Sequence, residues 1–148
     1  MYAEAIAQAR NALELNNSFF IKGYLALWLA KSGNRNESLE ILTELKKAAS
    51  EGYVRPSTLA VVYIGLGDKV EALNQLEKEV SSRSFNAIYL AVLPELDDLR
   101  SEPRFKAMLK RMNLPNETAS ALNHPNIPVV DVLCGGEHGY QKSGLDRG

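Results

Sequence analysis

The side chains best suited to chemistry stand near the end of the chain. Cys134 and His138 are four residues apart, a spacing that suggests a thiol nucleophile or a metal site, and His124 precedes them. A nucleophilic cysteine needs a positioned base and an orienting group, and structural zinc takes four ligands. The whole sequence holds one cysteine and two histidines, all in one glycine-containing segment. We therefore predict neither a catalytic thiol nor a metal site.

A second candidate is an acidic cluster of Glu95, Asp97 and Asp98, with Glu102 close by. Paired carboxylates perform acid–base chemistry only where a cleft shifts their pKa values. The helix dipole also favours acidic residues in first turns, so we expect these to be solvated helix-end charges. The sequence thus predicts no enzyme activity, no catalytic residue and no cofactor. The enzyme alternative requires residues 134–138 to fold over this cluster.

Composition restricts the class of partner. The 148 residues suit one domain, and their net charge of −1 offers no strong attraction for nucleic acid or an anionic membrane. There is no apolar run of membrane-spanning length and no signal-peptide pattern at the amino terminus. A single cysteine is compatible with a reducing compartment. We therefore expect a cytoplasmic protein that binds neither nucleic acid nor membrane.

The elements that must position any site form a repeat. Triplets at residues 4–6, 37–39 and 71–73 read Glu-Ala-Ile, Glu-Ser-Leu and Glu-Ala-Leu, at spacings of 33 residues (37 − 4) and 34 residues (71 − 37). A period near 34 with helical patterning is typical of stacked helix–turn–helix units. The apolar spacing predicts helices over residues 2–15, 18–32, 35–49, 55–66 and 69–82.

Short polar breaks separate these helices. Asn16, Asn17 and Ser18 are expected to cap the second helix with their side chains. Gly33 and Gly67 are expected to end the helices before them, because glycine readily adopts the left-handed conformation found there.

Beyond residue 83 the repeat weakens. We expect a short helix over residues 86–93, one turn over 95–99, and a last helix that Ser101 caps and Pro103 opens. An atypical final unit is expected physically, since the last repeat must cover its outer apolar face.

The sequence thus divides into three parts. Residues 1–82 form the helical repeats and residues 83–115 the carboxy-terminal capping helices. Residues 116–148 form a glycine-containing tail that we expect to be mostly disordered, with a short extended segment over 127–133 as an alternative.

The repeats resemble tetratricopeptide repeats (TPR). The likeness rests on turn glycines, a small residue that opens each second helix, an Ala-Leu pair and one aromatic residue, at Gly33, Gly67, Ala5, Ser38, Ala72, Ala12, Leu13 and Tyr63. Leu45 and Glu79 depart from the pattern where alanine is usual, as do Lys22 and Pro56 where an aromatic is common. The resemblance implies an all-α, right-handed superhelical stack of antiparallel helix pairs.

Two further resemblances concern context. Residues 93–105 resemble a segment that follows TPR arrays in bacterial signalling proteins, which fuse such arrays to transcription regulators, nucleotide cyclases or kinases. The first repeat lacks its first helix, so the chain looks like the end of a longer array. Residues 121–127 resemble a turn of eukaryotic-type protein kinases, but the kinase catalytic and metal-binding motifs are not found in the sequence.

In TPR arrays the first helix of each repeat lines a concave groove. By that resemblance the groove residues are Phe20, Tyr24, Leu27, Lys31, Thr58, Val61 and Ile64. The groove is mostly apolar and lacks a basic clamp for a terminal carboxylate, so we expect a protein or peptide partner with an apolar segment. Two alternatives stay open: a regulatory arm of a signalling enzyme or transcription regulator, and a homodimer through the uncovered helix over residues 2–15.

Overall fold

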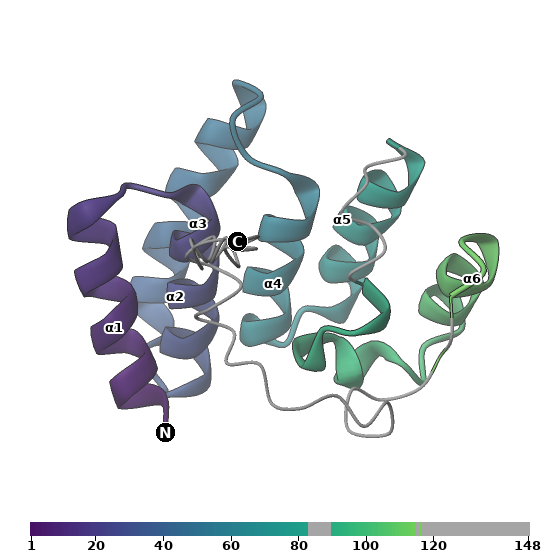
Figure 1. Ribbon diagram of the computed structural model, residues 1–148, viewed down its shortest axis with the longest axis horizontal. Helices are drawn as coiled ribbons and strands as arrows, with labels where there is room; N and C mark the ends of the chain where they lie inside the picture. The colour runs from purple at the N-terminus through teal and green to yellow at the C-terminus, as the bar shows by residue number, and fades with distance from the viewer. Residues whose placement is uncertain (83–89, 115, 117–148) are drawn as a thin grey trace, which may run out of the picture.

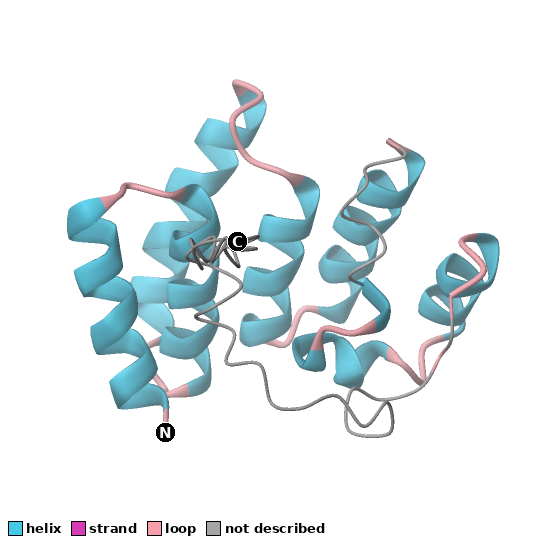
Figure 2. Ribbon diagram, viewed as in Figure 1, coloured by secondary structure: helices cyan, strands magenta, loops and turns pink. Residues whose placement is uncertain are grey.

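A computed structural model describes residues 1–82, 90–114 and 116 of the protein. Its regular elements are the helices α1 (Tyr2–Leu15), α2 (Phe19–Lys31), α3 (Arg35–Ser50), α4 (Pro56–Leu66), α5 (Lys69–Ser81) and α6 (Pro103–Arg111), and the 3₁₀ helix η2 (Pro94–Leu99). Figure 2 shows helices joined by short loops, and no strand occurs within the described ranges. The all-α prediction is confirmed for this part of the chain. None of these helices is long and apolar enough to cross a membrane.

The first five helices begin and end within one residue of the predicted bounds. Their turns explain this agreement. Gly67 ends α4 with φ of 80°, and Gly33 follows α2 with φ of 97°. Residues that carry a Cβ rarely adopt this left-handed backbone conformation. Asp68 then caps α5, because its Oδ1 accepts a hydrogen bond of 3.1 Å from the backbone N–H of Glu71.

Two predicted caps are wrong. Ser18 is the N-cap of α2, yet no side chain accepts a capping hydrogen bond there. The N-cap of α6 is Glu102 rather than Ser101, again without a side-chain cap bond. The helix α2 is stabilised by burial among its neighbours rather than by its cap. At the start of α6, Pro103 has no backbone N–H, so one donor fewer needs a hydrogen-bond partner.

The helices pack in the order of the chain, from α1 at one side of the molecule to α6 at the other (Figure 1). α1 packs on α2, α2 on α3 and α4, α4 on α3, α5 and η2, and α5 on α6. Gly23 lies against Thr58, and Leu27 lies against Gly65 further along both helices. α2 and α4 therefore run in the same direction, with α3 between them in sequence.

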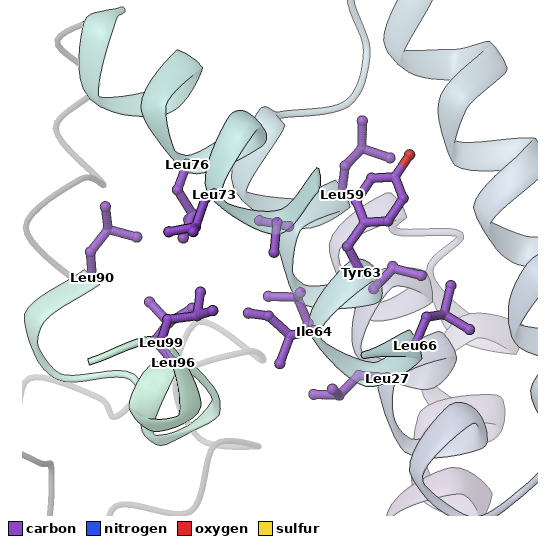
Figure 3. Close-up of a cluster of buried hydrophobic side chains, with 14 of the residues drawn as sticks. Leu27, Leu59, Tyr63, Ile64, Leu66, Leu73, Leu76, Leu90, Leu96 and Leu99 are labelled. Carbon is purple, nitrogen blue, oxygen red and sulfur yellow. The ribbon is translucent and has the colours of Figure 1, made fainter. Parts of the chain in front are cut away.

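A continuous hydrophobic core joins α2 to α6. Its largest fully buried side chains include Leu27, Leu45, Leu76, Leu99 and Phe105. Figure 3 shows the part of this cluster around α4, where Leu96 and Leu99 of η2 extend towards Ile64. A smaller cluster of Ala9, Ile21, Leu25 and Leu29 joins α1 to α2. The partly buried Trp28 packs against both clusters and connects them.

Small residues allow the close approach within each helix pair. Ser38 of α3 and Ala72 of α5, which occupy equivalent repeat positions, are each 0% exposed. The hydroxyl of Ser38 donates to the carbonyl oxygen of Ala26 at 2.8 Å, which satisfies a polar group in the packed interface between α2 and α3.

The carboxy-terminal predictions are covered only in part. The predicted turn over residues 95–99 is η2, and the predicted last helix is α6. The first half of the predicted helix over residues 86–93 lies outside the described residues, as does the tail over 116–148 apart from Asn116. The division of the chain into three parts stays a prediction.

Candidate partner-binding surface

Three aromatic rings stand along one side of α2 because they are four residues apart. The rings of Phe20 and Tyr24 meet edge to face with centroids 5.1 Å apart, and those of Tyr24 and Trp28 are 5.7 Å apart. Phe20 is 44% exposed, whereas Tyr24 is buried. Lys31 extends the same side of the helix and is exposed. We call Phe20, Tyr24 and Lys31 the α2 face.

The other predicted groove residues are in the core. Leu27, Thr58, Val61 and Ile64 are all buried. Thr58 approaches α2 so closely that its Cγ2 would lie 2.7 Å from a Cβ added at Gly23. Of the seven residues predicted to line a groove, Phe20 and Lys31 alone are exposed. Packing between α2, α4 and η2 thus occupies the apolar surface that the sequence assigned to a partner.

The acidic residues of η2 lie near the α2 face. The Nζ of Lys31 is 3.9 Å from the Oδ2 of Asp98. Burial raises the pKa of Glu95, which Lys31 partly offsets. The pKa of Tyr24 is also raised, first by burial and then by the Glu95 carboxylate. The carboxy-terminal unit therefore brings negative charge beside Tyr24 and Lys31.

The expectation that the acidic cluster is solvated holds for Asp98, whose side chain is 69% exposed, and is wrong for Glu95. The Oε2 of Glu95 is buried and has no hydrogen-bond partner among the described residues, and η2 packs against α4. Asp97 is held by Arg100, whose Nε donates to its Oδ1 at 2.6 Å. A second donor of Arg100 reaches the carbonyl of Ala91 at 2.8 Å. These contacts fix the shape of η2.

The other sequence candidates for chemistry fall elsewhere. His124, Cys134 and His138 lie outside the described residues. Among the residues that the structure does describe, no group of three or more His, Cys, Asp and Glu side chains could hold a metal ion.

A hollow that the sequence did not indicate lies between α3, α4 and α5. Its volume is about 320 Å³, and the loop residue Val54 contributes to its lining together with Leu59 and Tyr63 of α4. Lys46 and Lys78 border it from α3 and α5. The apolar periodicity of α3 places Lys46 on the side facing water, but it does not reveal that two lysines from different helices flank one depression.

The helix α1 presents a mixed outer surface. Its apolar residues Ile6, Ala12 and Leu13 are partly buried against α2, while Ala3 and Ala7 stand exposed beside polar residues. Leu15 at its end is 91% exposed. The homodimer predicted through this helix stays a prediction.

Comparison with protein families, with curated proteins and with solved structures finds no match. The likeness to tetratricopeptide repeats accordingly rests on the sequence positions quoted above.

Proposed function

We propose that this chain is a TPR-like helical repeat that binds a protein or peptide partner through the α2 face. The parallel packing of α2 and α4, one repeat apart, supports the TPR-like stack. So do the equivalent burial of Ser38 and Ala72 and the left-handed glycines at residues 33 and 67. Repeats of this kind use their length to present a surface to another molecule.

One observation carries the proposal of binding. Phe20 keeps 44% of its surface exposed, yet the edge-to-face contact with the buried Tyr24 holds its ring in place. An aromatic ring fixed in this way loses little conformational entropy on binding, and aromatic residues are enriched among the residues that dominate interface energies. Lys31, about three turns further along α2, and Asp98 of η2 supply polar contacts that would set the register of the partner.

The binding experiment uses Phe20→Ala and a matched control. Tyr53 is a second exposed aromatic residue, 69% accessible, in the loop between α3 and α4. We expect proteins captured by the intact chain to be lost by Phe20→Ala and retained by Tyr53→Ala, with affinity falling about tenfold or more. Equal capture by both variants would refute the proposal. Charged substitutions at Leu27 or Val61 are unsuitable tests, because both residues are buried and the chain would unfold.

A regulatory arm of a signalling protein is a second candidate. The segment resembling the end of bacterial TPR arrays, residues 93–105, packs into the hydrophobic core with the buried Leu96, Leu99 and Phe105. That placement is the one expected of a terminal unit. An in-frame effector domain encoded beside this chain would support the candidate, and a free-standing gene product of this length would count against it.

A further inference from the structure

The hollow between α3, α4 and α5 has an apolar floor and a defined rim. Val54, Leu59 and Tyr63 are buried residues whose surfaces line it. Its volume of about 320 Å³ stands at the lower end of the range for ligand pockets. Since it opens to solvent beside three helices, the geometry suits a side chain projecting from another protein.

The rim of the hollow is basic at one end. Lys46 of α3 and Lys78 of α5 both line it, both are exposed, and neither forms an ion pair with another residue in the described ranges. The hollow also includes Pro56 at the amino terminus of α4, but the Glu79 carboxylate accepts a hydrogen bond from the backbone N–H of Ser57 there and offsets the positive end of the helix dipole. The positive charge at the hollow therefore comes from two lysines on different helices.

Two acidic residues flank Lys78 in sequence, and neither pairs with it. Glu77 forms an ion pair with Arg104 of α6 at 2.8 Å. Glu79 follows Lys78 but is only 1% exposed, and its Oε2 accepts a hydrogen bond of 3.2 Å from the backbone N–H of Ser57. The carboxylate is thus turned inward, beneath the start of α4. The lysine side chains are left to meet solvent or a partner.

Tyr63 is the lining residue furthest along α4 from Pro56. The pKa of Tyr63 is raised by burial, and further by the carboxylates of Glu71 and Asp68. Both carboxylates belong to residues outside the lining of the hollow.

We propose that this hollow is a second docking site and that it takes an acidic amphipathic segment of another protein. An aliphatic side chain of that segment fills the space over Leu59, and its carboxylates lie against Lys46 and Lys78. Charge complementarity selects this occupant over a basic one, because basic side chains in the hollow would face two lysines. The site is separate from the α2 face.

The test selects peptides from a displayed random library on the intact chain. We expect the selected peptides to combine an aliphatic residue with flanking Asp or Glu, and their affinity to fall as salt rises. The double variant Lys46→Glu, Lys78→Glu should weaken the best peptide about tenfold or more. The control Lys106→Glu, Lys110→Glu has the same net charge and alters exposed residues of α6, so it should bind normally.

Three results would overturn the proposal: no enrichment of any peptide, enrichment without acidic residues, or equal loss of binding in both double variants. Circular dichroism of each variant confirms that it is folded. Phe20→Ala should leave binding of the acidic peptide unchanged. Loss of binding at the α2 face can therefore be distinguished from loss of binding at the hollow.

Discussion

Replacing Gly65 with alanine should destabilise the protein, although a helical Gly→Ala change usually does the reverse. Alanine is favoured over glycine by up to about 1 kcal/mol in a helix interior, and less near a helix end. Gly65 is the penultimate residue of α4, so this gain is small. A Cβ at this position would lie 2.9 Å from the Cα of Leu27 and 3.0 Å from its carbonyl oxygen.

The clash at Gly65 involves backbone, so a change of side-chain rotamer cannot relieve it. The two helices would have to move apart, and overpacking of this kind costs about 1–3 kcal/mol. After subtracting the small gain in helix propensity, we expect a net loss of about 1–2 kcal/mol. For a domain of this size, each kcal/mol lowers the melting temperature by about 2–8 °C. Thermal and denaturant unfolding, followed by circular dichroism, would measure it.

Gly23 provides the matched control. A Cβ there would lie 2.7 Å from the Cγ2 of Thr58, a side-chain atom, and 3.3 Å from the carbonyl oxygen of Thr58. Gly23→Ala should therefore destabilise alone and be rescued by Thr58→Ser, which removes that methyl group. Leu27→Ala should not rescue Gly65→Ala, because the contacted Cα and carbonyl oxygen remain. A Gly65→Ala protein as stable as the parent would show that α2 and α4 do not approach in this way.

Three further predictions concern η2, α5 and α6. Glu95→Gln should stabilise the protein at neutral pH. Burial raises the pKa of Glu95 in the folded state, so the protein is most stable with Glu95 protonated and loses stability as the pH rises through that folded-state pKa. The gap between Glu95→Gln and parent, followed by denaturant midpoints, should close on acidification, and a constant gap would contradict this cause. Arg104→Ala should destabilise at neutral pH and low salt. The hydrogen bond from Arg104 lowers the pKa of Glu77 in the folded state. The contribution of this bond to the stability of the protein is therefore present above the pKa of Glu77 in the unfolded chain, and it is lost as the pH falls through the folded-state pKa. If Arg104→Ala destabilises equally in acid, another contact is responsible. Ala72→Leu should cost about 1–3 kcal/mol by overpacking, whereas Val70→Leu, at a 62% exposed position of the same helix, should change the free energy of unfolding by less than about 0.5 kcal/mol.

The candidate site was harder to predict than the helices. The residues of α2 and α4 are apolar on nearly every side, so their sequences do not show which side remains open. The resemblance to TPR arrays assigned Leu27, Val61 and Ile64 to a groove, and the packing of α2, α4 and η2 puts them in the core. Phe20 was assigned to the same surface and is exposed, because it lies at the first turn of α2.

The sequence by itself determined where the helices begin and end, because a 3.6-residue period, Gly33, Gly67 and Asp68 act through atoms only a few residues away. Tertiary structure decided what each helix covers. The burial of Glu95, the inward turn of Glu79 and the pairing of Lys46 with Lys78 across one hollow each depend on a neighbour that is distant along the chain. The exposure of a side chain depends on which elements pack around it, so a local sequence pattern does not reveal it.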